Sequence, residues 1–222
     1  MLKSIAIDGP AGAGKSTIAK KIAGIKGIVY VDTGAMYRAM ALYCMRNCLS
    51  ADEPEKIEQS LDKIDITIEY ENNEQIVKLN GENVNGLIRT QEVGDKASSI
   101  STVGSVRKKM VALQQNLAAV KPVIMDGRDI GTVVLPEARV KIFLTASVEK
   151  RAERRFKELT EKGIECDLKQ IEKEIEERDY RDTHRENSPL KCADDAITVD
   201  TTDMSIDEVV EKILEIARDR GI

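Results

Sequence analysis

Short runs of apolar, mostly β-branched residues recur along the chain and alternate with stretches of helical periodicity. Runs without a polar face are typical of strands that are buried on both sides in a parallel sheet. Because such strands alternate with helices, the sequence predicts an α/β fold with a parallel five-stranded sheet flanked by helices. The predicted strands are Ser4–Ile7, Ile28–Val31, Val123–Met125, Val140–Leu144 and Ala196–Val199.

Two of the intervening helices can be located by their apolar faces. Ile18, Ile22 and Ile25 fall on one face of a helix that follows the first strand. Near the end of the chain the same period is kept by Ile206, Val209, Val210, Ile213 and Leu214. Ser205 with Glu208 three residues later predicts a capping box at the start of this last helix.

The composition excludes several classes of protein. The 222 residues are 41% hydrophobic and 33% charged, as in an ordinary globular protein. A net charge of −5 and 3% aromatic residues argue against a nucleic-acid surface. The longest apolar run, residues 39–45, is far shorter than the roughly 20 residues that a membrane-spanning helix needs. We expect a cytoplasmic protein, since the first strand begins too early to leave room for a signal peptide. We also expect the protein to be a monomer.

Two segments interrupt the alternation of strands and helices within what we expect to be one domain over residues 1–222. Residues 63–85 alternate apolar and polar side chains, and Asn72-Asn73 and Asn80-Gly81 supply turns, so we predict a small antiparallel β insert. In residues 149–191, 25 of 43 residues are charged, with both signs mixed. We predict a helical lid that moves, and the alternative is a helical hairpin that is merely solvated.

A glycine-rich segment after the first strand carries the chemistry. Residues 9–16 match G-x-x-x-x-G-K-[ST] between a predicted strand and a predicted helix. The glycines let the backbone curl so that its N–H groups face phosphate oxygens, and the helix N-terminus adds positive potential. Lys15 can bridge the β- and γ-phosphates, and the hydroxyl of Ser16 can hold Mg²⁺. The fold is therefore expected to be of the P-loop NTPase type.

Two arginines indicate that a second phosphate is bound. Arg38 lies about one turn into the helix that follows the second predicted strand, and Arg128 lies just beyond the carboxyl end of the third. Ligands of open α/β sheets bind at the carboxyl edge of the strands, so both arginines are expected near the phosphate loop. No Asn-Lys pair occurs anywhere in the chain, which argues against a guanine-reading GTPase. These features favour a small-molecule kinase.

Five segments together resemble the bacterial cytidylate (CMP) kinase family, and the resemblance extends over nearly the whole chain, including the β insert. The segments are Gly9–Thr17, Val31–Arg38, Ile88–Val93, Asp126–Thr132 and Glu177–Asp182. The D-G-R-D-x-G-T and E-R-D-x-R-D stretches are more specific than the phosphate loop. Ala11 departs from relatives that carry Ser there, which removes one side-chain contact while leaving the backbone cradle.

The resemblance implies a role for individual residues. ATP would be bound by Gly9, Pro10, Ala11, Gly12, Ala13, Gly14, Lys15, Ser16 and Thr17. The acceptor would be bound by Thr33, Arg38, Ser98, Arg107, Arg128, Asp129, Arg178, Asp182 and Arg185. Lys15, Arg128 and Arg181 would act in catalysis, and Ser16 and Asp126 would hold Mg²⁺. One of Arg151, Arg154 and Arg155 is expected to meet the donor, and His184 is expected to be a surface residue without a role.

The implied reaction is transfer of the γ-phosphoryl group of ATP to CMP or dCMP, in pyrimidine nucleotide metabolism. The attacking atom is an anionic phosphate oxygen, so no general base is needed, and catalysis depends on positioning and charge. The alternatives are a kinase of another small acceptor such as UMP, AMP or shikimate, a P-loop nucleotide switch, and a non-catalytic nucleotide-binding module.

The base is expected to be read by complementary donors and acceptors. A carboxylate at Asp129 accepts from the N4 amino group of cytosine, and Arg107 donates to N3 and O2. Ser98 can do either. The alternative for Asp129 is that it only orients its neighbour Arg128.

Overall fold

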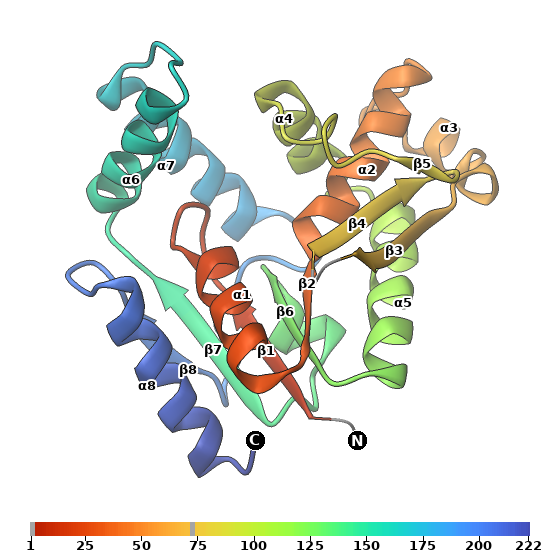
Figure 1. Ribbon diagram of the computed structural model, residues 1–222. Helices are drawn as coiled ribbons and strands as arrows, with labels where there is room; N and C mark the ends of the chain where they lie inside the picture. The colour runs from red at the N-terminus through yellow and green to blue at the C-terminus, as the bar shows by residue number, and fades with distance from the viewer. Residues whose placement is uncertain (1–2, 72–73) are drawn as a thin grey trace. The chain divides into compact units, whose positions relative to one another are not determined.

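The computed structural model describes residues 3–71 and 74–222, and two compact units can be distinguished within it (Figure 1). The first unit is made of Met1–Tyr30 and Lys121–Ile222, and the second is Val31–Val120. The chain therefore leaves the first unit within its second strand and returns to it just before β6 (Val123–Gly127). That the whole chain acts as one domain stays a prediction.

The larger sheet confirms the predicted five strands. Its order is β2–β6–β1–β7–β8, with β1 at the centre. Strand β1 pairs in parallel with β6 and β7, and β7 pairs in parallel with β8. Each strand ends one or two residues later than its predicted run: β1 Ser4–Asp8, β2 Val29–Asp32, β6 Val123–Gly127, β7 Val140–Thr145 and β8 Ile197–Asp200. The added residues include Asp8 and Asp126, so carboxylates stand at the carboxyl edge of the sheet.

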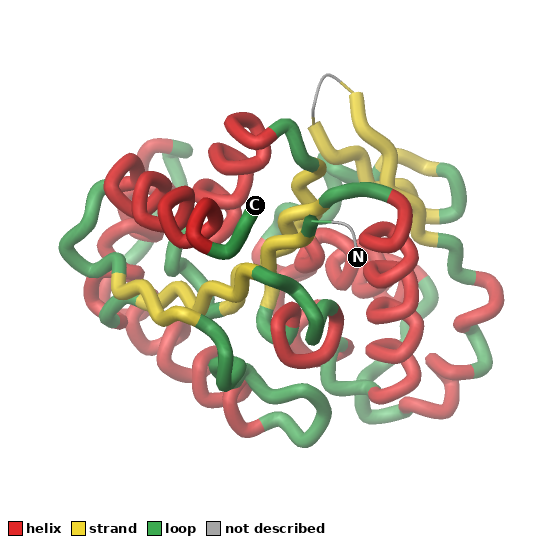
Figure 2. Tube along the Cα trace, turned by 90° about the horizontal axis from the view of Figure 1, so that it is seen from below, coloured by secondary structure: helices red, strands yellow, loops and turns green. Residues whose placement is uncertain are grey.

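Helices α1 (Lys15–Lys26) and α8 (Ile206–Asp219) cover one face of this sheet, and Figure 2 shows both on the same side of the strands. Ile18 and Ile22 of α1 are buried with Val209 and Ile213 of α8 in one apolar cluster with β1 and β7. The prediction for Ile25 is wrong, because that side chain is 62% exposed. In the last turn of α1, Ala23 takes the position that faces the cluster.

The capping box at the start of α8 is confirmed. Ser205 accepts a hydrogen bond from the backbone N–H of Glu208, and the Glu208 carboxylate accepts one from the N–H of Ser205. Two of the N–H groups that a helix leaves without partners in its first turn are satisfied in this way. Ile206, the first residue of the helix, is 48% exposed, so its predicted place on the buried face is wrong.

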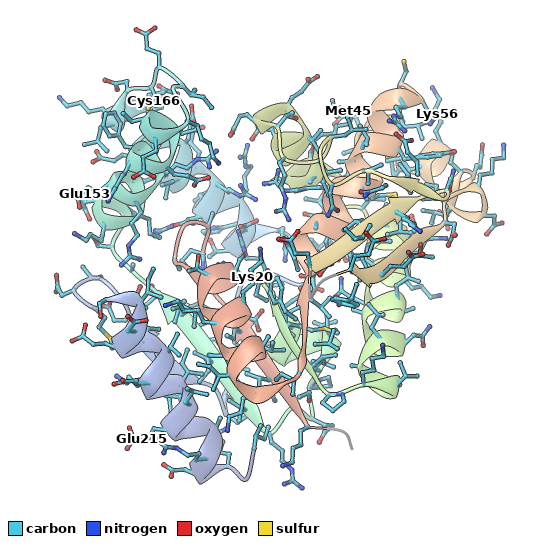
Figure 3. The ribbon with its side chains drawn as sticks, viewed as in Figure 1. Lys20, Met45, Lys56, Glu153, Cys166 and Glu215 are labelled. Atoms are coloured by element: carbon cyan, nitrogen blue, oxygen red, sulfur yellow. The ribbon has the colours of Figure 1, made fainter. Side chains whose placement is uncertain are left out.

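Two helices form the segment that we predicted to be a lid. They are α6 (Val148–Glu161) and α7 (Leu168–His184), which pack against each other as a hairpin. Their contact is a small cluster of their own, around Ala152, Ile171 and Ile175. Most of the hairpin's surface is charged, as Figure 3 shows around Glu153. A hairpin with so small a core is suited to moving as a body, and its motion stays a prediction.

The second unit contains the predicted β insert. Its strands β3 (Ile66–Glu71), β4 (Glu74–Leu79) and β5 (Glu82–Asn83) form an antiparallel sheet. Asn80 and Gly81 both have positive φ, 49° and 84°, as the predicted Asn-Gly hairpin turn requires. The Asn72-Asn73 turn lies outside the described residues. The helices are α2 (Thr33–Arg46), α3 (Pro54–Glu58), α4 (Gln91–Ile100) and α5 (Gly104–Val120), of which α2 packs on α4 and β4.

Two further observations concern the described part of the chain. Among its helices, none combines the length and the apolar character that crossing a bilayer demands. The four cysteines are all described, and all are free thiols.

Candidate functional site

The glycine-rich segment forms a tight loop between β1 and α1, as predicted (Figure 1). Gly9 has φ 146°, and a Cβ there would lie 1.9 Å from the carbonyl oxygen of Leu144 on β7. Gly14, which directly precedes α1, is left-handed with φ 87°. Only glycine adopts both conformations without strain, so these residues fix the curl of the backbone. The first N–H groups of α1 open onto this loop, and such groups bind phosphate in other proteins.

Lys15 is the buried cation of this loop. Its side chain is only 6% exposed, and Nζ donates a hydrogen bond of 2.7 Å to the carbonyl oxygen of Pro10. Burial, and after it the positive charge of Arg128, lowers the pKa of Lys15 to about 7, although Asp126 and Asp8 oppose the shift. An anionic phosphate beside Nζ would favour the charged form again. Binding of a phosphate beside Nζ would therefore change the protonation state of Lys15.

The predicted metal ligands lie in contact. Ser16 Oγ donates to Asp126 Oδ2 at 2.9 Å, from the start of α1 to the end of β6. The other carboxylate oxygen, Oδ1, accepts from Tyr30 Oη at 2.8 Å. Hydroxyl and carboxylate oxygens are the ligands that Mg²⁺ prefers, and it usually takes one or two from the protein and the rest from phosphates and water. Within the described residues no cluster of three or more His, Cys, Asp or Glu offers another metal site.

Arg128 lies at the carboxyl end of β6, as predicted, and is held by the hairpin. Its Nε donates to Asp182 Oδ2 of α7 at 2.8 Å, and the two side chains are 18% and 8% exposed. Burial alone would raise the pKa of Asp182, but Arg128, with Arg178 and Arg185, lowers it. Arg128 and Arg178 also act on Lys15. Lys15 and these arginines therefore gather cationic charge beside the phosphate loop.

Three further arginines were candidates for the donor. Arg151 is 3% exposed and donates to the carbonyl oxygens of Ala146 and Ala11 and to Asp179 of α7, so it braces the loop from behind. Arg154 donates to Thr201, and Arg155 pairs with Glu158 on the surface.

The remaining lid residues have separate positions. Arg181 is exposed on α7, and Arg185 donates to the carbonyl oxygen of Ser188. His184 is exposed and stacks on Tyr180 with ring centroids 4.0 Å apart. It is a surface residue, as expected.

Asp8 is a buried carboxylate that the sequence analysis did not single out. Its two oxygens accept the backbone N–H groups of Ile130 at 2.8 Å and Gly131 at 2.7 Å. These N–H groups begin a π-helical turn, Ile130–Val134, directly after Arg128 and Asp129. Burial raises the pKa of Asp8 to about 6. A signal was present in the sequence, since an acidic residue at the end of an apolar strand must find partners when the strand is buried.

In the second unit, Arg38 lies on α2 against the segment that leads into α4. Its Nη1 donates to the carbonyl oxygens of Ile88 at 3.2 Å and Thr90 at 3.4 Å. A Cβ on Gly94 would come within 3.0 Å of the same nitrogen, so the guanidinium lies directly over a glycine. Asp32 accepts from the N–H of Ala35 at the start of α2 and pairs with the nearby Arg89 at 2.8 Å.

The predicted base-reading residues of the second unit are linked to one another. Arg107 of α5 is 5% exposed and donates to the carbonyl oxygen of Ser101, while Ser101 Oγ donates to the carbonyl oxygen of Ser98. The guanidinium of Arg107 also lies over the ring of Tyr37, 5.5 Å from its centroid. Neither Ser101 nor Tyr37 was predicted. Thr33 is buried at the first position of α2, and Asp129 is buried in the first unit.

A family comparison now identifies the chain. The sequence model described as cytidylate kinase matches residues 5–219, from the middle of β1 to the end of α8. The chain belongs to the cytidylate kinase family. The match includes the phosphate loop, the β insert and the α6–α7 hairpin, so the suspected resemblance is confirmed over nearly the full length.

Relatives named cytidylate kinase resemble the chain closely. The protein from Lactobacillus johnsonii is 55% identical over 215 residues, which cover 97% of this chain and 94% of that protein. The protein from Caldicellulosiruptor saccharolyticus is 52% identical over 213 residues, covering 96% and 94%. Among solved structures, shikimate kinase from Acinetobacter baumannii in complex with shikimate has a TM-score of 0.50 at 15% identity, covering 100% of this chain and 96% of that one. That likeness concerns the fold alone.

The raised pKa of Asp8 predicts a pH dependence of stability in this cytidylate kinase family member. A carboxyl whose pKa rises from 3.8 to about 6 on folding binds its proton more tightly in the folded state. The stability that this provides is complete below pH 4 and is lost as the pH rises through 6. Relative to Asp8→Asn, the free energy of unfolding should fall by roughly 2 kcal/mol between pH 4 and pH 7.

Urea unfolding of both proteins across this range measures the difference. Asp207→Asn removes a carboxylate that is 81% exposed and serves as the control, for which we expect a nearly constant difference. A difference between the native protein and Asp8→Asn that does not change with pH would contradict the assignment.

Proposed function

We propose that the protein transfers the γ-phosphoryl group of ATP to the phosphate of CMP or dCMP, forming ADP and CDP or dCDP. The observation that carries the proposal is the match to the cytidylate kinase family over residues 5–219, together with relatives of that name at 52–55% identity. The proposed setting is pyrimidine nucleotide metabolism in the cytoplasm, where both substrates are soluble metabolites, and the proposed working form is a monomer.

The donor phosphates are assigned to the loop of residues 9–17. Its glycine backbone and the first N–H groups of α1 would hold the phosphate oxygens, and Lys15 would neutralise the β- and γ-phosphates. Ser16 and Asp126 fit a divalent cation, because their oxygens already lie 2.9 Å apart at the loop. When bound, Mg²⁺ would neutralise phosphate charge as transfer proceeds. Asp126 would act on it through water.

The chemical step requires little covalent work from the protein. An anionic oxygen of the CMP phosphate attacks the γ-phosphorus, the bond from that phosphorus to the β–γ bridging oxygen breaks, and ADP leaves. The nucleophile carries no proton that must be removed. Lys15 and Arg128 would therefore act by position and charge, as would Arg181, which is exposed on α7 and could reach the transferring group.

The acceptor is assigned to residues of both units. In the second unit, Arg38 would bind the CMP phosphate, with Thr33 beside it on α2. In the first unit, Arg128 would do so, and Arg178, Asp182 and Arg185 would bind ribose and phosphate. The buried Arg128–Asp182 pair supports this assignment, because it holds the guanidinium at the carboxyl end of β6.

Cytosine is assigned to Ser98, Arg107 and Asp129. Arg107 is held by the carbonyl oxygen of Ser101 and by the ring of Tyr37, so its guanidinium has a defined direction. It would donate to N3 and O2, while Asp129 would accept from the N4 amino group. Uracil presents a carbonyl oxygen at position 4 instead, which would face the carboxylate unfavourably.

Product analysis with a panel of acceptors tests the proposal directly. With ATP and Mg²⁺, we expect formation of CDP from CMP and of dCDP from dCMP at much higher kcat/KM than any product from UMP, AMP, GMP or shikimate. A preference for shikimate or AMP would indicate a different kinase. Nucleotide hydrolysis that no acceptor changes would indicate a P-loop switch.

The base-reading role of Asp129 predicts a change in specificity. Loss of the carboxylate removes a hydrogen bond to CMP and an unfavourable contact with UMP, together worth about 1–3 kcal/mol. The ratio of kcat/KM for CMP to that for UMP should therefore fall about tenfold to a hundredfold in Asp129→Ala.

The control is Glu137→Ala, which removes an exposed carboxylate from the segment that follows and should leave the ratio unchanged. An equal loss for CMP and UMP in Asp129→Ala would mean that this residue only orients Arg128.

A further inference from the structure

Tyr30 brings a buried phenol to the carboxylate that we assign to the metal. It is the second residue of β2, is 8% exposed and belongs to the apolar cluster of the first unit. Its Oη donates to Asp126 Oδ1 at 2.8 Å. We propose that Tyr30 is a positioning residue that sets the orientation of Asp126 and, through it, the divalent-cation site at Ser16. The inference rests on the proposed function, because it presumes that a nucleotide and its cation bind at the loop.

The first step of the argument is the geometry of the carboxylate. Asp126 is 5% exposed, and its two oxygens have different partners, Tyr30 on Oδ1 and Ser16 on Oδ2. A carboxylate with one oxygen held by a rigid buried ring cannot turn freely about its terminal torsion, which is otherwise a broad one. The oxygen that faces Ser16 is therefore fixed by the bond on the other side.

The second step concerns the hydroxyl of Ser16. A hydroxyl has one proton to donate and oxygen lone pairs with which to accept or to coordinate. Because Ser16 donates that proton to Asp126 Oδ2, its lone pairs are the groups that it can present to a cation. If Asp126 rotated, the proton of Ser16 would be free to turn toward the cation, and coordination would weaken. Tyr30 would thus act on the metal indirectly, through Asp126 and Ser16, as residues that hydrogen-bond to metal ligands commonly do.

The third step concerns the strength of the phenol as a donor. Lys20, which Figure 3 labels on α1, has its ammonium group 5.7 Å from the centroid of the Tyr30 ring. A cation over the ring face draws electron density from the phenol and makes its O–H a stronger donor. A hydrogen bond to an ionised carboxylate inside a protein is already among the stronger kinds. We therefore expect the hydrogen bond between Tyr30 and Asp126 to be strong.

The test uses Mn²⁺ as the probe, with ADP bound to the full-length protein. Electron paramagnetic resonance measures free Mn²⁺ and so gives its Kd in the ADP complex, while calorimetry in EDTA gives the affinity for ADP without metal. In Tyr30→Phe we expect Mn²⁺ to bind about tenfold more weakly, since loss of a partner behind a metal ligand costs about 10–100-fold. Affinity for metal-free ADP should change less than twofold. Tyr43→Phe, which removes the hydroxyl of a half-buried tyrosine on α2, should change neither the affinity for Mn²⁺ nor that for metal-free ADP.

The outcomes separate a role through Asp126 from a general effect on the fold. Mn²⁺ affinity in Tyr30→Phe within twofold of the native value would overturn the proposal. An equal weakening of metal-free ADP would also overturn it, because the loop itself would then have been disturbed. In the background of Asp126→Asn, Tyr30→Phe should have no further effect on Mn²⁺, whereas a second tenfold loss would show that Tyr30 acts by another route.

These binding measurements use no CMP and do not depend on turnover. The proposal about Tyr30 can therefore fail while the proposed acceptor stands, or hold while the acceptor proves to be another molecule.

Discussion

The charge of Lys15 is buried in a loop made of backbone, and the arrangement around the loop follows from the need to hold that charge. Among the described residues, its Nζ donates to one carbonyl oxygen, that of Pro10, and its surroundings lower its pKa to about 7. Asp126 and Asp8 lie close enough to favour the ammonium, while Arg128 opposes it. A buried cation without a direct carboxylate partner is costly, and an incoming phosphate removes that cost. The site is thus prepared for anions and is less stable without them.

Two carboxylates of α7 hold arginine side chains in place. Asp182 holds Arg128, and Asp179 holds Arg151, which in turn donates to the carbonyl oxygen of Ala11 in the phosphate loop. The Arg128–Asp182 ion pair therefore links α7 to the end of β6, and the Arg151–Asp179 pair joins the two helices of the hairpin. The hydrogen bond from Arg151 to Ala11 connects the hairpin to the phosphate loop. Both ion pairs lie largely out of water, where such pairs are weakly screened. Phosphate oxygens compete with carboxylates for guanidinium groups. We therefore expect nucleotide binding to shift this hairpin, and that motion stays a prediction.

The sequence predicted most of what local patterns determine. The five strands, the β insert with its Asn80-Gly81 turn, the capping box at Ser205 and the phosphate loop are all local in sequence, and all are confirmed. Ile25 shows the limit of periodicity, because it keeps the helical spacing of Ile18 and Ile22 and is nevertheless 62% exposed. Ser16 and Asp126, the two residues predicted to hold Mg²⁺, are hydrogen-bonded to each other, and their role as metal ligands stays a prediction.

The parts that were not predicted depend on contacts between distant residues. Asp8 meets residues 122 and 123 positions away, and Tyr30 meets Asp126 across two neighbouring strands. No spacing in the sequence signals such contacts, since they arise only when the strand order is known. The contacts of Arg151 were not predicted either. The sequence offered it as a candidate for binding the donor, whereas in the structure it donates to backbone carbonyl oxygens and to Asp179.

The proton balance of nucleotide binding tests the central claim most directly. Calorimetric titration with ADP at pH 7.5, in buffers of different ionisation enthalpy, gives the number of protons taken up. If the pKa of Lys15 is about 7 and phosphate restores its charge, the native protein should take up about three quarters of a proton more than Lys15→Arg, whose guanidinium is always charged. Equal proton uptake by the two proteins would show that Lys15 is already fully charged before nucleotide binds, and would contradict the account.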